Sequence, residues 1–237
     1  MRITVFLVAL WATLPLMAQD VDLELVLLAD ASGSIGPDEI RFQRQGYADA
    51  FTDPEVVEAI TNTAYGKIAV TYVEWAANQT VVVDWVEISD AASAEAFAAA
   101  LLVPPRQAYG RNAIGAALLE GKRLIESNDI DGWRKVIDFS GDSARNFSGP
   151  PIGVARAEVL AAGIAINGLP IYCRFCASGA TQSDLETIYE EQIIGGIGSF
   201  VVAAEGVEDL ASAIKRKLIL EISSRTVGAP VVVTLPE

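Results

Sequence analysis

The sequence contains no histidine, and this absence excludes several common kinds of active site. Ser-His-Asp and Cys-His catalysis need an imidazole base, and histidine-ligated zinc needs its ring nitrogens. The chain has only two cysteines, which are too few thiolates to hold zinc without histidine. Any chemistry must therefore depend on oxygen ligands, on the two cysteines or on lysine.

Basic residues are few, and nucleotide-binding loops are absent from the sequence. The 17 lysines and arginines face 31 aspartates and glutamates, which gives a formal net charge of −14. A field of this sign repels nucleic acid and anionic lipid, and it favours divalent cations and basic partners. Neither G-x-x-x-x-G-K-[ST] nor G-x-G-x-x-G occurs. We therefore expect neither a nucleotide-phosphate loop nor a nucleic-acid partner.

Long hydrophobic runs are limited to the N-terminus. Met1 and Arg2 precede a mostly apolar stretch at residues 3–18, which predicts a secretory signal peptide cleaved after Ala18. Pro15 and the short length argue against a spanning helix, and an uncleaved anchor is the alternative. No later segment is long and apolar enough to cross a bilayer. The sequence therefore predicts a secreted or periplasmic protein with no membrane span after signal cleavage.

The remaining chain predicts one α/β domain at residues 19–223 and a C-terminal tail at residues 224–237. The 237 residues are 51% apolar, which is enough for one full core. Apolar strands alternate with helical patterns, and this order predicts a doubly wound, Rossmann-like sheet with helices on both faces. We expect six strands, mostly parallel, with one antiparallel strand from a hairpin. The expected strands are 23–29, 67–76, 80–88, 135–140, 164–167 and 199–204.

The apolar run at residues 23–29 leads directly into a polar turn that carries Asp30, Ser32 and Ser34. Ligands of parallel α/β sheets bind at the carboxyl ends of the strands. Alternate residues of an extended segment point the same way, so one carboxylate and two hydroxyls converge on one point. This donor set suits a hard cation such as Mg²⁺. The simpler alternative is that these side chains only cap the turn and the following helix.

Two further polar turns lie where a strand ends or a helix begins. One, at residues 110–112, ends in Asn112, and the other, at residues 141–143, carries Asp142. In a doubly wound sheet the first and fourth strands flank the point where strand order reverses, so their carboxyl ends meet. We therefore expect Asp142 to lie beside the turn that follows the first strand.

The order of elements, the D-x-S-x-S motif from Asp30 to Ser34 and the later Asp142 resemble a von Willebrand factor A domain with its metal-ion-dependent adhesion site. This resemblance covers nearly all of the mature chain. The stretches INGLPI, IIGGIGSFVVAA and AIKRKLILEIS further resemble an uncharacterised secreted bacterial branch of that superfamily.

The resemblance implies a ligand set for Mg²⁺ or Mn²⁺. Ser32 and Ser34 would bind the metal directly, while Asp30 and Asp142 would act through waters. A further hydroxyl comes from a threonine in the family, and this chain has Asn112 at that position. An asparagine carbonyl is an acceptable ligand for a hard cation, but Asn112 could equally be a plain helix N-cap.

The resemblance also implies a non-catalytic, exported protein-interaction module. In the family, the open coordination position of the metal takes a carboxylate from a protein partner. Two neutral hydroxyls and more distant carboxylates leave the cation electrophilic enough to attract such an anion. Arg111 and Arg145 lie in loops at the same edge, where they either contact the partner or are solvated loop charges.

Two other functions are open at this point. A Mg²⁺-dependent phosphohydrolase would use Asp30 as its nucleophile. The haloacid-dehalogenase pattern expects a second acid two residues later, where this chain has Ser32, and a lysine near the later acidic turn, where it has Ser140 and Arg145. The missing acid argues against catalysis. A metal-free structural module is the third possibility, because Asn112 replaces the threonine.

The remaining motifs have local explanations. Cys173 and Cys176 have C-x-x-C spacing, and in an exported protein we expect a local disulfide between them. A thioredoxin-like role is disfavoured because no helical pattern begins directly after the first cysteine. Asn78 and Asn146 each match the N-glycosylation acceptor pattern, which is frequent by chance.

Overall fold

The computed structural model describes residues 19–172 and 182–223. The predicted signal peptide, Cys173, Cys176 and the predicted C-terminal tail lie outside these residues. The described strands are β1 (Gln19–Asp30), β2 (Ile68–Trp75), β3 (Gln79–Ile88), β4 (Ile130–Gly141) and β5 (Ala165–Pro170). The helices are α1 (Pro37–Thr52), α2 (Pro54–Thr61), α3 (Ala91–Leu102), α4 (Ile114–Ser127), α5 (Ile152–Ala161), α6 (Gln182–Ile188), the π-helix η1 (Tyr189–Ile193) and α7 (Val207–Ser223).

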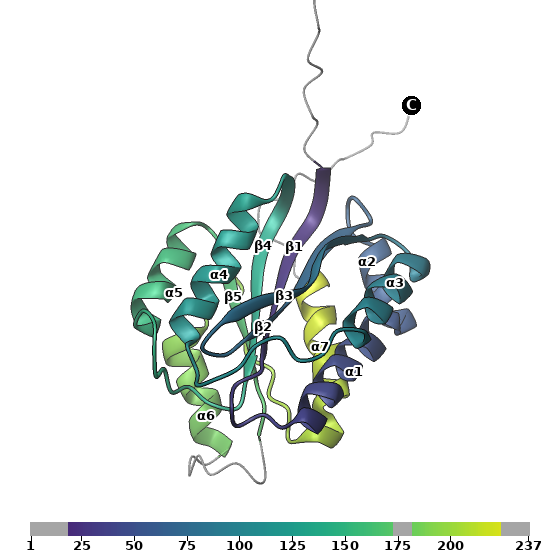
Figure 1. The fold of residues 1–237 in the computed structure, drawn as a ribbon. Helices are drawn as coiled ribbons and strands as arrows, with labels where there is room; N and C mark the ends of the chain where they lie inside the picture. The colour runs from purple at the N-terminus through teal and green to yellow at the C-terminus, as the bar shows by residue number, and fades with distance from the viewer. Residues whose placement is uncertain (1–18, 173–181, 224–237) are drawn as a thin grey trace, which may run out of the picture.

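The sheet has the strand order β3-β2-β1-β4-β5 (Figure 1). β1 pairs in parallel with both β2 and β4, and β4 pairs in parallel with β5. β2 and β3 form the antiparallel hairpin. The prediction of a doubly wound, mostly parallel sheet with one antiparallel strand is therefore confirmed, and strand order reverses between β1 and β4.

The predicted sixth strand is not a regular strand. Residues 199–204 run beside β5, but they form only isolated bridges, at Gly168 with Val201 and at Ile171 with Ala204. Between these bridges lies Pro170, whose ring nitrogen has no hydrogen to donate to the neighbouring segment. The ladder is interrupted at that point, so the described sheet has five strands rather than six.

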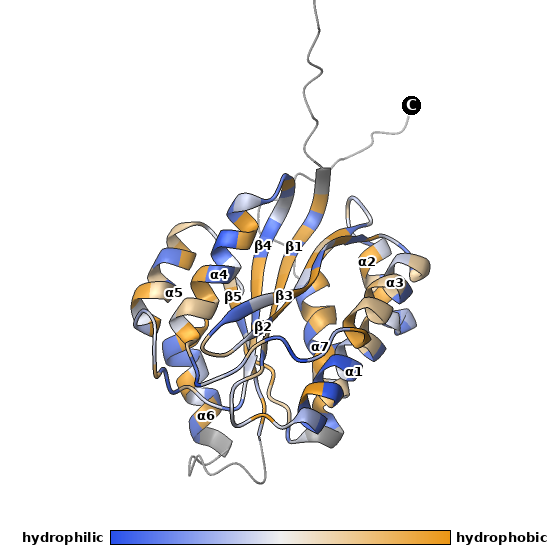
Figure 2. Ribbon diagram, in the orientation of Figure 1, coloured by the Kyte–Doolittle hydropathy of each residue, from blue (hydrophilic) through white to orange (hydrophobic). Residues whose placement is uncertain are grey.

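Helices cover both faces of the sheet, as predicted (Figure 1). α1, α2, α3 and α7 pack on one face, and α4, α5, α6 and η1 pack on the other. Figure 2 shows that the strands between the two layers are largely hydrophobic. No helix among the described residues is long and apolar enough to span a membrane.

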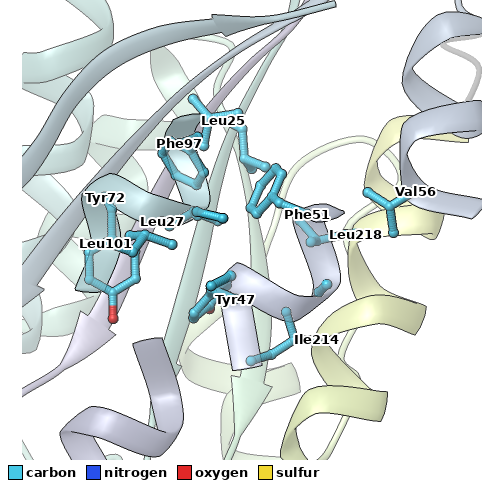
Figure 3. Close-up of a cluster of buried hydrophobic side chains, with 14 of the residues drawn as sticks. Leu25, Leu27, Tyr47, Phe51, Val56, Tyr72, Phe97, Leu101, Ile214 and Leu218 are labelled. Atoms are coloured by element: carbon cyan, nitrogen blue, oxygen red, sulfur yellow. The ribbon is translucent and has the colours of Figure 1, made fainter. Parts of the chain in front are cut away.

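Alternate residues of β1 supply the two cores. Leu25 and Leu27 belong to the core beneath α1 and α7, whereas Val26 and Leu28 belong to the core beneath α4 and α5. Figure 3 shows the first core, where Leu25 and Leu27 point towards the aromatic side chains of α1. Because both faces of β1 are buried, the strand is held from both sides up to its carboxyl end, where Asp30 lies.

Candidate metal centre

The carboxyl ends of β1 and β4 lie side by side at the point where strand order reverses. Ala29 of β1 pairs with Ser140 of β4, so the next residues, Asp30 and Gly141, are neighbours at the same edge, and Asp142 follows directly. Parallel sheets bind ligands at this edge, outside the switch in strand order. The structure therefore brings Asp142 to the turn that follows β1.

Three loops form this edge: the first loop at residues 31–36, the second at residues 103–113 and the third at residues 142–151. The backbone N–H of Gly33 donates to the carbonyl of Gly110 over 2.8 Å, which joins the first loop to the second. The N–H of Phe147 donates to the carbonyl of Asn112 over 2.9 Å, which joins the third loop to the second. All three oxygen-rich turns singled out in the sequence thus meet in one place.

The first loop places the hydroxyls of Ser32 and Ser34 next to the end of β1, where Asp30 lies. The Asp30 side chain is completely buried, and its Oδ1 accepts a hydrogen bond of 2.7 Å from the backbone N–H of Ser32. The Oγ atoms of Ser32 and Ser34 are 3.1 Å apart. Ser32 is buried and Ser34 is exposed, so the pair of hydroxyls leads from the interior to the surface.

Burial disfavours the ionised form of both carboxyl groups of the site. The pKa of Asp30 is raised to about 7, mainly by burial and also by the negative charge of Asp142, while hydrogen bonds from Ser32 lower it. Burial also raises the pKa of Asp142, and the charge of Glu39 adds to this, while a hydrogen bond with Ser34 lowers it. A cation beside both groups would favour their ionised forms.

The donor set fits a hard divalent cation. Oδ2 of Asp30 is buried and has no hydrogen-bond partner among the described residues, so it is available to a ligand or to an ordered water. Across the described ranges, no cluster of three or more Asp, Glu or Cys side chains is placed to hold a metal. Binding here would therefore rely on hydroxyls and waters as well as carboxylates, a set that suits Mg²⁺ or Mn²⁺.

Asn112 lies buried in the second loop, and its backbone carbonyl accepts the hydrogen bond from the backbone N–H of Phe147. The alternative prediction, that Asn112 caps the following helix, is wrong. α4 begins at Ile114, and its N-cap is Ala113, which makes no side-chain capping bond.

The aromatic side chains of Trp75 and Tyr189 form the floor of the site. Trp75 Nε1 donates to the carbonyl of Ser140 over 3.1 Å, and the Tyr189 hydroxyl donates to the carbonyl of Gly141 over 2.9 Å. A Cβ atom on Gly141 would lie 2.9 Å from Oδ2 of Asp30 and 3.0 Å from the Trp75 ring. A side chain here would have to displace its neighbours, so glycine lets the end of β4 approach Asp30 closely.

Tyr189 reaches this floor from η1. The π-helical turn begins at Tyr189, directly after α6 ends at Ile188. Its ring lies 5.8 Å from that of Phe139, which in turn stacks on Trp75 at 4.9 Å. Such turns are often found at functional sites. The periodicity of apolar side chains in the sequence does not identify a single π-helical turn.

Arg106 was not singled out in the sequence, but it braces the first loop from the second. Its guanidinium donates to the carbonyls of Ile35 (3.1 Å) and Ser32 (2.9 Å), and also to that of Ala31. The Nε atom donates back to Ala108 within its own loop. One arginine therefore holds the backbone on both sides of the Ser32 hydroxyl.

A buried ion pair in turn holds the second loop. Glu74 lies at the end of β2, completely buried, and its Oε1 accepts from Arg44 of α1 at 2.6 Å. Its Oε2 accepts the backbone N–H of Gln107, while Arg44 also donates to the carbonyl of Pro105. Sequence patterns give no signal for these contacts, because the partners are mostly main-chain atoms.

The two asparagines of the glycosylation patterns are engaged in bracing the loops. Nδ2 of Asn146 donates to the carbonyl of Pro150, and its Oδ1 accepts from Gly115 at the start of α4. Nδ2 of Asn78 donates to the carbonyl of Gln107 in the second loop. Both side chains are therefore part of the loop structure, and a glycan on either would replace one of the two Nδ2 N–H donors.

Solved structures with the same fold show that the chain has a von Willebrand factor A-like fold. Proximal thread matrix protein 1 from the mussel byssus, in a structure with a zinc-occupied MIDAS motif, matches with a TM-score of 0.60 at 16% identity, over 85% of this chain and 46% of that one. The pilus adhesin SpaC from Lactobacillus rhamnosus GG matches with a TM-score of 0.59 at 13% identity, over 86% of this chain and 31% of that one.

A third structure, von Willebrand factor type A from Catenulispora acidiphila, matches with a TM-score of 0.57 at 16% identity, over 85% of this chain and 43% of that one. The chain thus spans less than half the length of these three solved chains. No curated protein matches its sequence significantly. Residues 20–226 match the family described as protein of unknown function DUF1194, and because this match extends over most of the sequence, the chain belongs to that family.

Proposed function

We propose that the protein is a non-catalytic interaction module that binds one Mg²⁺ or Mn²⁺ ion and uses it to recognise a carboxylate of a partner protein. Ser32 and Ser34 would bind the metal directly, and Asp30 and Asp142 would hold its waters. Asn112 would supply a further oxygen. The observation that carries the proposal is the buried Oδ2 of Asp30, which has no hydrogen-bond partner among the described residues and lies beside convergent hydroxyls at the switch in strand order.

When bound, the metal would supply an electrophilic centre for an external anion. The protein's own part is to hold the hydroxyls of Ser32 and Ser34 together and to keep both carboxylates buried beneath them. The mussel protein, whose structure is described with a zinc-occupied MIDAS motif, supports a metal at this position of the fold. The pilus adhesin, a protein described by its adhesive role, supports a function in binding.

Burial argues against the phosphohydrolase alternative. Asp30 has no solvent-exposed surface, and its Oδ1 already accepts the N–H of Ser32. An aspartate nucleophile must reach the phosphorus atom of a substrate in line with the leaving group, and the buried carboxylate does not offer that approach. Ser32 also stands where the second acid of such enzymes would be needed.

Calorimetric titration with Mg²⁺ and with Mn²⁺ tests the metal site. We expect saturable binding of one ion to the purified protein and to Ser148→Ala, a control on an exposed serine of the third loop. Binding should be lost in Asp30→Ala and in Ser32→Ala. No binding by the parent protein would favour the metal-free structural module. Mg²⁺-dependent hydrolysis of p-nitrophenyl phosphate that is lost in Asp30→Asn would favour the enzyme.

The place of action belongs to the same proposal. We propose that residues 1–18 direct the protein to the periplasm or outside the cell and are then removed. N-terminal sequencing of the protein recovered from a cell fraction should begin at Gln19. A protein that keeps Met1 and stays with the membrane would instead indicate an uncleaved anchor.

A further inference from the structure

Arg111 and Phe147 form an exposed pair at the edge of the candidate metal centre. The guanidinium carbon of Arg111 lies over the ring of Phe147, 3.8 Å from its centroid. Arg111 directly precedes Asn112, and the backbone N–H of Phe147 donates to the carbonyl of Asn112 over 2.9 Å. The pair is therefore fixed to the backbone of a proposed metal-site residue, although its two members come from different loops.

Neither member of the pair is explained by packing or by an internal ion pair. Phe147 is 47% exposed, and its ring face is covered by the guanidinium of Arg111. Arg111 is exposed and has no carboxylate partner among the described residues. By contrast, Arg106 of the same loop uses its guanidinium on main-chain carbonyls, and Arg123 on α4 pairs with Glu120. Arg111 is thus an available cation in a chain of net charge −14.

Stacking on the Phe147 ring orients the guanidinium of Arg111 so that it can bind an anion. A guanidinium stacked on an aromatic ring keeps its N–H groups in its own plane, where they point away from the ring. The ring also restricts the side chain, so that less conformational entropy is lost when a ligand binds. The planar fork of arginine matches the two oxygens of a carboxylate.

We infer that Arg111, held by Phe147, is a second recognition point for the partner that binds at the metal, and that this partner presents a short segment with two carboxylates. One carboxylate would bind the metal and the other would pair with Arg111, so the inference rests on the proposed function. The exposed guanidinium of Arg111 beside a cation site is complementary to two closely spaced carboxylates, whereas the chain's net charge of −14 disfavours a long polyanion or a nucleic acid, so a short acidic peptide segment fits best.

Binding of small acidic peptides tests this inference. The probes are fluorescein-labelled peptides with two glutamates at spacings of one, two or three residues, such as Gly-Glu-Ala-Glu-Gly, and matched peptides in which either glutamate is replaced by glutamine. In an extended peptide, glutamates two residues apart lie about 7 Å from each other on one side. Fluorescence anisotropy with the Mg²⁺-loaded full chain measures each Kd.

We expect at least one two-acid peptide to bind about tenfold more tightly than its matched single-acid peptides. Arg111→Gln should abolish this preference, and Arg111→Lys should lose most of it, because lysine keeps the charge but not the stacked planar fork. Phe147→Leu should weaken the preference. Arg123→Gln removes one positive charge far from the second loop, and this variant should keep the preference for two-acid peptides. Mg²⁺ titration of each variant reports whether the metal site is intact.

The outcomes separate the two proposals. Equal Kd values for two-acid and single-acid peptides, with binding that still needs Mg²⁺, would overturn the inference about Arg111 and leave the metal site in place. A preference that survives in Arg111→Gln would also overturn it. Two results would overturn the proposed function and this inference with it. One is peptide binding that is unaffected by removing Mg²⁺ or by Ser32→Ala. The other is that no peptide binds at all.

Discussion

The guanidinium of Arg106 donates a hydrogen bond of 2.9 Å to the carbonyl of Ser32, so a residue of the second loop fixes the turn that carries the candidate metal ligands. The same guanidinium reaches the carbonyls of Ala31 and Ile35, on either side of Ser32 and Ser34. Arg106 touches no proposed ligand through its side chain. Its effect on a metal would come entirely from the position it gives to the backbone of the first loop.

Replacing Arg106 should therefore weaken metal binding without removing a ligand. We expect Arg106→Lys to lower the affinity for Mg²⁺ by about 10-fold or more, because one ammonium cannot span three carbonyls as a guanidinium does. Calorimetric titration measures the change. Arg123→Lys, at an exposed pair on α4, serves as the control and should bind Mg²⁺ like the parent. Equal affinities for the two variants would show that the first loop holds its shape without Arg106.

Gly141 gives a second prediction, because its Cβ position is already filled by Asp30 Oδ2 and the Trp75 ring. We expect Gly141→Ala to destabilise the protein by about 1–3 kcal/mol and to displace the Asp30 carboxylate. Urea unfolding measures the first effect and Mg²⁺ titration the second. Gly153→Ala is the matched control, since nothing lies within 4 Å of that Cβ position in α5. It should be neutral or stabilising by up to about 1 kcal/mol.

The neighbouring positions of β1 and β4 and the meeting of the three polar turns are predictable from sequence. A continuously apolar run that ends in a carboxylate and hydroxyls, as at Asp30 and Ser32, identifies a buried parallel strand and its functional edge. The same reasoning applies to β4 and Asp142, because strands separated by helices restrict the possible topologies to a few. These features depend on side-chain pattern, which the sequence displays directly.

The bracing of the loops is not predictable in this way. Arg106 and Glu74 act mainly on main-chain carbonyls and N–H groups, which every residue has, so no pairing pattern marks their partners. Pro170 interrupts the hydrogen-bond ladder between β5 and residues 199–204. This effect can be recognised only once the two segments are known to be adjacent. The N-cap prediction for Asn112 fails for a related reason, because contact with the third loop shifts the start of α4.

A cluster of buried charged side chains between α7 and β4 predicts how the free energy of unfolding depends on pH. Lys217 of α7 pairs with Asp138 of β4 at 2.7 Å and with Glu221, and all three side chains are buried. The pKa of Glu221 is raised to about 7, mainly by burial and also by the charge of Asp138, against the lowering effect of Lys217. The unfolded chain has a glutamate pKa of about 4.3. The folded state therefore binds a proton that the unfolded state has released.

It follows that the Glu221 contribution to stability is fully present below about pH 4 and is lost as the pH rises to about 7. We expect the stability difference between Glu221→Gln and the parent to move in favour of the variant over this range, because glutamine does not ionise. Urea midpoints at pH 5, 6, 7 and 8, without divalent metal, measure this difference. A difference that is the same at every pH would contradict the prediction.

The last prediction concerns Glu74, whose two oxygens bind Arg44 and the backbone of the second loop. Glu74→Gln leaves the Arg44 guanidinium buried without a counter-charge, and we expect a loss of about 3–5 kcal/mol in the free energy of unfolding. Glu87→Gln is the matched control on the next strand. Its pair with Lys67 is partly exposed, so its loss should be at most about 1 kcal/mol.

Loss of stability alone does not distinguish a broken ion pair from a displaced loop, and the double variant Arg44→Met with Glu74→Leu separates the two. Removing both charges should recover much of the stability lost in Glu74→Gln, because no unpaired charge remains buried. It should not recover Mg²⁺ affinity, since the acceptor for the N–H of Gln107 is still missing and Arg106 is no longer held. Recovery of both stability and Mg²⁺ affinity in the double variant would show that Glu74 matters for folding but does not position the metal centre.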